Sequence, residues 1–238
     1  MMRMKKTPKL EIPEIIFEDD DLIVINKPAG LRSIQDGYDP DLPHLRTLLE
    51  PDYGDLWIVH RLDKDTSGII LLARTAEAHR RLNKSFRERL VEKIYHGLVT
   101  PAPNWGQKDL NLPLRTNADR KHRTRVDMTN GKIASTSFSV EKRFALGVLM
   151  KIEIKSGITH QIRAHLRSLD LSLLGDALYQ AGLPEQPIPV ERTMLHAREI
   201  RFIHPTQQTR LHFTANYPED FRTAYTNLRI TTTTDLML

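Results

Sequence analysis

A charged stretch between two apolar runs is the sequence feature that most constrains how this chain can fold. Residues 60–68 read His-Arg-Leu-Asp-Lys-Asp-Thr-Ser-Gly and lead directly into the apolar run 69–73. A second apolar run, 56–59, precedes them. Short apolar runs bounded by turn residues are typical of buried strands, so we expect Asp63 in a connection between two strands. A carboxylate beside an arginine on a loop held by rigid strands is a common arrangement for chemistry.

Composition narrows the class of protein. The chain has 238 residues, 39% of them hydrophobic, which is enough for a sizeable core. It contains no cysteine, which excludes disulfides and cysteine-ligated metals. The N-terminus is basic without an apolar segment, and no long apolar span follows, so neither a signal peptide nor a transmembrane helix is predicted. We expect a cytoplasmic protein without a membrane partner. The net charge of +5 favours nucleic acid only slightly.

Hydrophobic patterning predicts a mixture of strands and helices. Strands are expected at 15–17, 22–25, 56–59, 69–72, 93–99, 134–140, 147–154 and 211–215. Helices are expected at 45–49, 75–90, 160–169 and 221–228, and a loop at 101–113. The strands at 134–140 and 147–154 are expected to pair antiparallel. No internal repeat or break in composition marks a domain boundary.

The helix expected at 75–90 is amphipathic. Thr75 is a suitable N-cap, because its side chain can accept a hydrogen bond from the first turn. An apolar residue recurs every four positions along one face. The predicted buried stripe is Ala78, Leu82, Phe86 and Leu90.

The densest basic patch lies at residues 115–125. It holds five arginine or lysine residues and one histidine, with Asp119 as the one acidic residue. Through Arg123 and Arg125 such a patch can contact phosphates. It can equally be a solvated, mobile loop, and the charge run alone leaves both interpretations open.

The helix expected at 160–169 breaks a local rule. Thr159 is a good N-cap, but His160 and Arg163 place basic side chains in the first turn. Cations there oppose the helix dipole, at about 0.3–1 kcal/mol each. Sequences that break a local rule often do so for function. The pattern predicts an anion site that a carboxylate or a phosphate would fill.

Simpler interpretations compete with the functional ones. Taken alone, Asp63 is read as a turn aspartate paired with a surface lysine rather than as a nucleophile. Lys27, at the tip of the second strand, is read in isolation as a surface lysine. A metal site could be drawn from five residues, but their spacing matches no metal-binding pattern, so no metal is expected. Those five residues are His60, Asp63, Asp65, His160 and His165.

Five motifs follow one another between about residues 14 and 215. They are Asn-Lys-Pro-Ala-Gly at 26–30, the stretch 60–68, Lys-Ile-Tyr at 93–95, Gly-Ile-Thr-His-Gln-Ile-Arg-Ala-His-Leu at 157–166 with Gly-Asp-x-x-Tyr at 175–179, and Leu-His-Ala at 195–197 with His-Pro at 204–205. In this order they resemble the RluA-type pseudouridine synthases. Ile158 and the Leu-Leu pair at 173–174 depart from the family pattern, which bears on substrate identity more than on chemistry.

The resemblance implies a fold and a domain organisation. The fold is the α/β (α+β) pseudouridine synthase fold, a long, mainly antiparallel mixed sheet with flanking helices and loops around a central catalytic cleft. A single catalytic domain is expected at 13–228, with no N-terminal S4-like domain. A flexible basic tail is expected at 1–12, and a second tail at 229–238.

The resemblance also implies a mechanism. Asp63 would be the nucleophile that assists cleavage of the uridine N-glycosidic bond, and the detached uracil would rotate and rejoin through C5. Arg163 would pair with Asp63 and keep it ionised and aimed. Tyr95 would stack on the uracil, and a part in removing the C5 proton is left open. No cofactor or metal is implied.

The expected partner is structured RNA, either a ribosomal RNA or a transfer RNA stem-loop, bound by a monomer. Leu195 would pack beneath the base, and His160 is placed among the substrate-binding residues. Arg61 is expected to fill the gap left by the extruded base. Arg123 and Arg125 are candidates for gripping phosphates.

Two rival functions stay open. One is a non-catalytic RNA-binding or ribosome-assembly protein on the same fold; an altered Asp63 or Arg163 would signal it, and both residues are present. The other is a metal-dependent hydrolase that uses histidine and aspartate. Chelators would abolish its activity, whereas a pseudouridine synthase would be insensitive to them.

Overall fold

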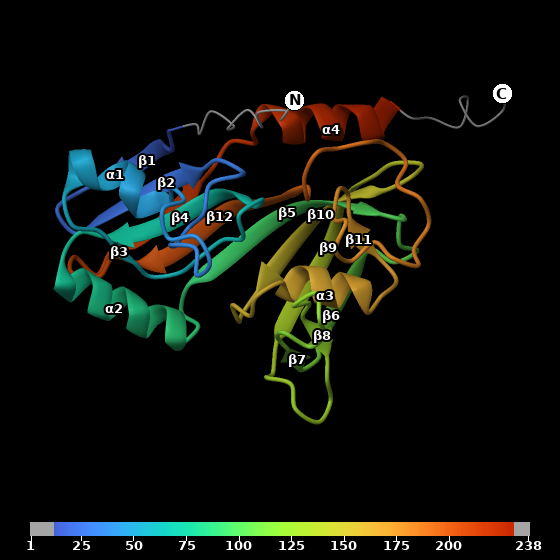
Figure 1. Cartoon of the computed structure of the whole chain (residues 1–238), viewed down its shortest axis with the longest axis horizontal. Helices are drawn as coiled ribbons and strands as arrows, with labels where there is room; N and C mark the ends of the chain where they lie inside the picture. The colour runs from blue at the N-terminus through green and yellow to red at the C-terminus, as the bar shows by residue number, and fades with distance from the viewer. Residues whose placement is uncertain (1–11, 231–238) are drawn as a thin grey trace, which may run out of the picture.

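One large sheet organises the computed structural model, which describes residues 12–230 (Figure 1). Its strands are β1 (Glu14–Glu18), β2 (Leu22–Lys27), β3 (Trp57–Ile58), β4 (Ser67–Ala73), β5 (Glu92–Thr100), β6 (Gln107–Asn111), β9 (Ser135–Arg143), β10 (Val148–Ile154), β11 (Ser172–Leu173), β12 (Leu195–Ile203) and β13 (Arg210–Thr214). The main path runs β1-β2-β4-β12-β5-β10-β9-β6, with β3, β13 and β11 paired to β4, β12 and β5. Among the described strands, only β4 and β12 pair in parallel. The expected long, mainly antiparallel mixed sheet is confirmed.

Within residues 12–230, four helices and a small hairpin complete the fold. The helices are α1 (Leu45–Tyr53), α2 (Ala76–Arg87), α3 (Gln161–Arg167) and α4 (Glu219–Ile230). The hairpin pairs β7 (Leu114–Arg115) with β8 (Arg125–Val126). We call residues 114–126 the arm. Figure 1 shows the arm near α3 and at the opposite side of the molecule from α4.

Both faces of the sheet are buried, because alternate residues of its central strands enter different clusters. Ile23 and Ile70 pack in one cluster with residues of α1 and α3. Their neighbours Leu22 and Ile69 pack with α2. Further along the same face as α2, α4 covers Leu98 of β5. Each fully buried aliphatic side chain contributes about 1.5–3 kcal/mol, so the helices are held mainly by their apolar faces.

The backbones of β4 and β12 approach closely where the two strands pair in parallel. A Cβ atom on Gly68 would lie 2.2 Å from the carbonyl oxygen of Ala197, and the φ angle of Gly68 is +111°. Only glycine accommodates both constraints without strain. This contact fixes the end of the loop that carries Asp63 against the start of β12, which carries Leu195.

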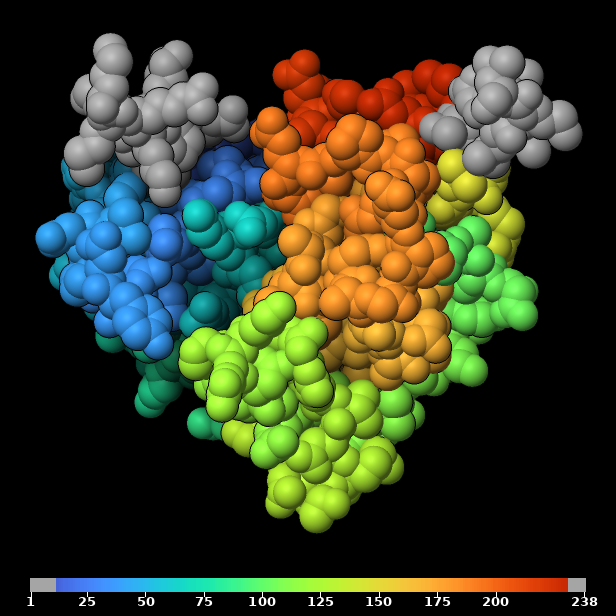
Figure 2. All heavy atoms as spheres, turned by 45° about the vertical axis from the view of Figure 1, so that its right-hand side comes forward, coloured from blue at the N-terminus to red at the C-terminus, as the bar shows by residue number. Residues whose placement is uncertain are grey.

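Figure 2 shows a hollow on one side of the molecule, between the blue-to-teal N-terminal segments and the yellow-green and orange segments. The yellow-green segment includes the arm, and the orange segment follows α3. Residues of these segments, together with residues of β5 and of the region from β10 to α3, line the cavities described below.

Most predicted elements are present, with four corrections. The loop at 101–113 contains β6, which the pattern missed because Leu110 is its one buried residue. Helix α2 ends at Arg87, so Leu90 is 63% exposed and not part of the buried stripe. Thr159 does not cap α3, whose N-cap is His160. Lys27 is fully buried rather than on the surface.

The predicted N-cap of α2 is confirmed, because the side chain of Thr75 accepts a hydrogen bond from the amide of Ala78. Of the predicted tails, residues 1–11 and 231–238 lie outside the described residues, and α4 continues through Ile230. Within residues 12–230, no helix combines the length and apolar composition needed to cross a membrane.

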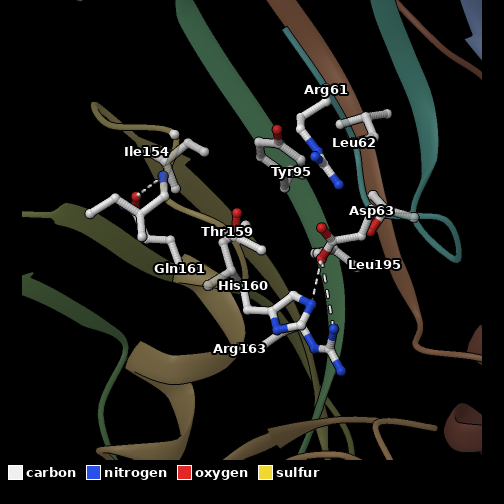
Figure 3. Close-up of a pocket in the computed structure, with 14 residues that line it drawn as sticks. Arg61, Leu62, Asp63, Tyr95, Ile154, Thr159, His160, Gln161, Arg163 and Leu195 are labelled. Atoms are coloured by element: carbon white, nitrogen blue, oxygen red, sulfur yellow. Dashed lines mark hydrogen bonds and ion pairs between the residues drawn. The ribbon is translucent and has the colours of Figure 1, made fainter. Parts of the chain in front are cut away.

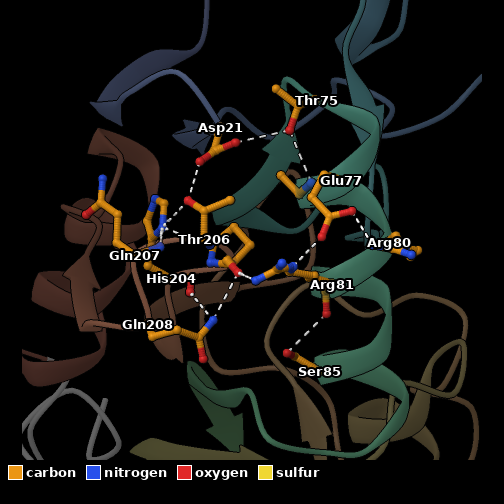
Figure 4. A network of polar contacts seen from close by, with 12 residues as sticks. Asp21, Thr75, Glu77, Arg80, Arg81, Ser85, His204, Thr206, Gln207 and Gln208 are labelled. Carbon is orange, nitrogen blue, oxygen red and sulfur yellow. Dashed lines mark hydrogen bonds and ion pairs between the residues drawn. The ribbon is translucent and has the colours of Figure 1, made fainter.

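A network of polar contacts next to α2, which we call the clip, joins three segments of the chain (Figure 4). Asp21 accepts hydrogen bonds from Thr75 and Thr206, so it ties the β1–β2 turn to α2 and to the β12–β13 turn. In the same turn, Asp19 accepts hydrogen bonds from two backbone amides and lies 2.8 Å from Nε2 of the buried His204. Burial acts to raise the pKa of Asp19, but these contacts outweigh it and lower the pKa.

The clip predicts a pH-dependent contribution to stability. Ionised Asp19 stabilises the fold above the ordinary carboxyl pKa, and this contribution is lost as pH falls through the lower pKa of the folded state. Asp19→Asn should therefore lower the free energy of unfolding by about 1–3 kcal/mol at pH 7. Urea denaturation measured between pH 7 and pH 3 should show that the difference in free energy of unfolding between Asp19→Asn and wild type becomes smaller as the pH falls.

The matched control is Asp20→Asn, because Asp20 is exposed in the same turn. It should stay close to wild type throughout the series. If the loss of stability in Asp19→Asn stays constant or grows at low pH, the stabilising role of the ionised Asp19 is contradicted.

Candidate active site

A cavity of about 80 Å³ on the α1 and α3 face of the sheet gathers six of the eight predicted site residues (Figure 3). These six are Arg61, Asp63, Tyr95, His160, Arg163 and Leu195. A neighbouring cavity of about 210 Å³ also includes Asp63, His160 and Arg163 in its lining, so the site continues beyond the first cavity. Asp63 is the one carboxylate among the residues that line the first cavity.

The loop that carries Asp63 is held by the segment after β2. The ammonium group of Lys27 donates to the carbonyl oxygens of Pro28, Leu31 and Lys64, at 2.8, 2.8 and 3.1 Å. Burial, aided by the charge of Arg192, lowers the pKa of Lys27 to about 7. The lysine read as a surface residue therefore anchors this loop.

A second tie holds the residue before Asp63. Ser33 accepts a hydrogen bond from the amide of Leu62 and donates one to its carbonyl oxygen. On the C-terminal side of Asp63, the amide of Thr66 donates a hydrogen bond to the carbonyl oxygen of Asp63 at 3.1 Å. The backbone is thus fixed on both sides of Asp63 while its carboxylate faces the cavity.

Two basic groups face the Asp63 carboxylate without binding it tightly. His160 Nε2 and Arg163 Nη1 both lie 3.7 Å from Asp63 Oδ2. Figure 3 shows both side chains pointing at this oxygen. Distances of 3.7 Å are too long for hydrogen bonds, so the carboxylate is oriented electrostatically and keeps its lone pairs available. The predicted pairing of Arg163 with Asp63 exists only in this loose form.

The firm partner of Arg163 is Asp176. Its carboxylate receives two hydrogen bonds of 2.7 Å, from Nε and Nη2 of Arg163, and its side chain is only 1% exposed. Burial acts to lower the pKa of Arg163, but the hydrogen bonds and charge of Asp176 outweigh it and raise the pKa. Sequence reasoning gave Asp176 no role, although its Gly-Asp-x-x-Tyr motif was the available signal.

Tyr95 and Leu195 come from neighbouring strands. Tyr95 lies on β5 opposite Ala197 of β12, two residues after Leu195. Burial, with a contribution from the charge of Asp63, raises the pKa of Tyr95 well above that of a free phenol. The hydroxyl is therefore protonated at neutral pH, and Tyr95 can stack or donate but is a poor general base.

His160 stands at the N-cap of α3 in a left-handed conformation, with a φ of +56°. The turn before it is closed by the buried side chain of Gln161, which accepts from Ser156 Oγ and the amide of Ile158. Because the turn is closed in this way, the N-cap of α3 is His160 and not the predicted Thr159. Burial lowers the pKa of His160, although the nearby Asp63 acts to raise it.

Arg123 and Arg125 do not line the cavity that contains Asp63. They line a separate cavity of about 450 Å³ beside α3, together with Arg167 and Tyr179. Both are ion-paired with Asp119, at 2.7 and 2.8 Å, and the side chain of Arg125 is the more exposed of the two. Burial acts to raise the pKa of Asp119, but Arg123 and backbone amides lower it to about 2.

Two of the three histidines considered for a metal site are engaged elsewhere, and the third, His160, faces Asp63. His60 Nε2 accepts a hydrogen bond from the amide of Leu71. His165 lies within hydrogen-bond distance of Thr136 Oγ1 and the carbonyl oxygen of Leu112. Within residues 12–230, no group of three histidine or acidic side chains is arranged to hold a metal ion.

Known proteins match both the sequence and the fold. The family model for RNA pseudouridylate synthase matches residues 21–168. The chain is 33% identical to ribosomal large subunit pseudouridine synthase D of Zymomonas mobilis, over 92% of this chain and 74% of that protein. It is also 33% identical to the dual-specificity RNA pseudouridine synthase RluA of Escherichia coli K12, over 87% of this chain and 93% of that protein.

Among solved structures, human RNA pseudouridylate synthase domain containing 4 superimposes with a TM-score of 0.75 at 24% identity. The superposition covers 91% of this chain and 93% of the human one, and it supports the fold. The family match and the identity to curated relatives settle the relationship. The chain belongs to the RNA pseudouridylate synthase family, as an RluA-type pseudouridine synthase, and is therefore an isomerase.

Proposed function

We propose that this chain isomerises specific uridines to pseudouridine in structured RNA, with Asp63 as the nucleophile. The observation that carries the proposal is the setting of Asp63: it is the one carboxylate among the lining residues, faced by two basic groups but bound tightly by neither. An oriented, ionised carboxylate is a competent nucleophile in glycosyl chemistry.

The reaction balances as an isomerisation, with water taking the C5 proton and supplying the proton on N1. Asp63 assists cleavage of the bond between C1′ of the ribose and N1 of the uracil. The detached base rotates, and C5 bonds to C1′. The proton on C5 is lost and N1 gains one, so the product is an isomer of the substrate. No cofactor or metal takes part in this scheme.

Each neighbouring residue has a proposed task. Arg163 orients the Asp63 carboxylate electrostatically, while Asp176 keeps the arginine in place. Tyr95 stacks on the uracil; its raised pKa favours this role over proton removal. Leu195 supplies the apolar surface beneath the base.

RNA recognition requires a base to leave its stack, which costs a few kcal/mol. Arg61 is exposed at the rim of the cavity, and we assign it to the space that the extruded base leaves. His160 contributes to substrate binding from the opposite wall. Arg123 and Arg125, which line the cavity beside α3, contact phosphates.

The relatives suggest the RNA class and the cellular setting. Their names refer to the ribosomal large subunit in one case and to dual specificity in another. We therefore propose ribosomal RNA, transfer RNA or both as substrate. The protein acts as a cytoplasmic monomer whose single catalytic domain spans 13–228.

The chemistry predicts tritium release from RNA labelled at C5 of uridine. The wild type should release tritium from ribosomal or transfer RNA, tested as separate pools, and Asp63→Asn should lower the rate at least about 1,000-fold because the nucleophile is gone. Asp55→Asn is the matched control, since Asp55 is exposed and outside the cavity.

The same assay distinguishes the rival functions. With RNA folded in monovalent salt, a chelator should leave the rate unchanged, whereas a metal-dependent hydrolase would be inhibited. Activity that survives in Asp63→Asn would refute the assigned nucleophile. RNA binding by the wild type without tritium release from either pool would instead favour the non-catalytic function.

The arm predicts a salt-dependent contribution to RNA affinity. Replacing Arg123 and Arg125 together with alanine should weaken binding and reduce the slope of log affinity against log salt by about 1–2, because each phosphate contact releases a counterion. Arg125 should contribute more, since Arg123 is more deeply buried against Asp119. Filter-binding titrations at several salt concentrations measure the slope.

The control for this experiment is Arg222→Ala, on the exposed side of α4. This variant removes one positive charge, against two in the arm variant, at the opposite side of the molecule from the arm (Figure 1). It should keep the wild-type slope. An unchanged slope in the arm variant would exclude Arg123 and Arg125 as phosphate contacts.

A further inference from the structure

Tyr179 joins the arm to the catalytic cavity. Its hydroxyl accepts a hydrogen bond of 2.8 Å from the amide of Thr124 and lies 3.2 Å from the carbonyl oxygen of the same residue. The hydroxyl also lies 3.3 Å from Nδ1 of His160. Thr124 stands between Arg123 and Arg125, the candidate phosphate contacts. Tyr179 is only 3% exposed, so these contacts are shielded from water.

The aromatic ring of Tyr179 touches both basic groups that face Asp63. The guanidinium carbon of Arg163 lies 4.9 Å from the centre of the ring. The imidazole of His160 packs edge-on, with ring centres 5.8 Å apart and planes at 88°. A cation over an aromatic face is attracted to it, so the ring helps to place Arg163 as well as His160. Tyr179 thus touches both groups that orient Asp63 without touching Asp63 itself.

Thr124 makes a second connection between the same two regions. Its hydroxyl donates to the carbonyl oxygen of Thr159 at 2.7 Å. Thr159 directly precedes His160, the N-cap of α3. Thr124 is itself 1% exposed, so a displacement of the arm cannot leave the Thr159–His160 backbone unaffected.

The proton of the Tyr179 hydroxyl has two possible acceptors. Burial raises the pKa of Tyr179, so the hydroxyl is protonated at neutral pH. Its single proton can go to the carbonyl oxygen of Thr124 or to Nδ1 of His160. In the second case the neutral imidazole carries its own proton on Nε2, the atom that faces Asp63. A shift of Thr124 therefore alters the hydrogen bonding of the group opposite the nucleophile.

We propose that Tyr179 is a positioning residue that couples phosphate-backbone contact on the arm to the two basic groups facing Asp63. RNA bound at the arm orders the backbone of Thr124, and Tyr179 transmits this order to His160 and Arg163. The arm then contributes to the rate of the chemical step as well as to affinity. This inference rests on the proposed function, since the rate concerned is that of isomerisation.

Tyr179→Phe tests the coupling because it keeps the ring and removes only the hydroxyl. The single-turnover rate of tritium release at saturating RNA should fall about 10- to 100-fold, the range expected for a misplaced catalytic group. The Kd for RNA should stay within about twofold of wild type. Tyr225→Phe, the same change on α4, should alter neither quantity. Thermal melting records any change in stability separately.

Thr124 provides a second, independent variant. Thr124→Val removes the hydrogen bond to Thr159 and should also lower the rate at saturating RNA, while Thr124→Ser retains the hydroxyl and should restore it. A general loss of stability would not discriminate between the two substitutions in this way. An equal rate for the valine and serine variants would count against the connection through Thr124.

A double-mutant cycle gives the decisive comparison. In the wild-type background, Arg125→Ala should lower both the affinity and the saturated rate. In the Tyr179→Phe background, it should lower the affinity alone, because the connection is already broken. An unchanged rate in Tyr179→Phe, or multiplicative rate effects of the two substitutions, would overturn the coupling. A wild type without isomerase activity would refute the proposed function instead, so the two failures are distinguishable.

Discussion

The buried ion pair between Arg163 and Asp176 is the interaction on which the site depends. A guanidinium buried near a cavity needs a permanent counterion, and the nearly inaccessible Asp176 supplies one through two hydrogen bonds. Because the arginine is already satisfied, Asp63 is left with a loose electrostatic contact at 3.7 Å. The proposed nucleophilic role of Asp63 fits this arrangement, since the charge of Asp63 can change without leaving Arg163 unpaired.

The sheet brings the remaining groups to the same place. The loop of Asp63 is tied through Lys27 and Ser33 to the segment after β2. At its other end, Gly68 allows β4 to approach β12 closely. Tyr95 and Leu195 follow from the pairing of β5 with β12. The cavity is therefore built on rigid strands at one wall and on the short helix α3 at the other, which restrains the groups around Asp63.

What the sequence could predict depended on whether a feature was local. Strands such as β2 and β10 were predicted because their apolar residues mark them, whereas β6 was missed because it buries only Leu110. Lys27 looked like a surface lysine, because the three carbonyl groups that hold it meet only in the folded chain.

Prediction of the site from the sequence was limited in the same way, because it could not supply contacts between distant residues. The resemblance to a family supplied Asp63, Tyr95 and Arg163, and the structure places them around one cavity. It paired Arg163 with Asp63 and not with Asp176, because the Gly-Asp-x-x-Tyr motif contains Asp176 without indicating which residue it contacts. The separation of Arg123 and Arg125 from the catalytic cavity was equally invisible in the charge pattern, because burial and pairing with Asp119 are tertiary properties.

The central proposal is that Asp63 drives an isomerisation rather than a hydrolysis. The most direct measurement is the nucleoside composition of the substrate RNA after digestion, with free uracil measured in the same reaction. We predict that pseudouridine rises by the amount that uridine falls, that no uracil is released, and that neither change occurs with Asp63→Asn. Free uracil without pseudouridine, or pseudouridine formed equally well by Asp63→Asn, would contradict the claim.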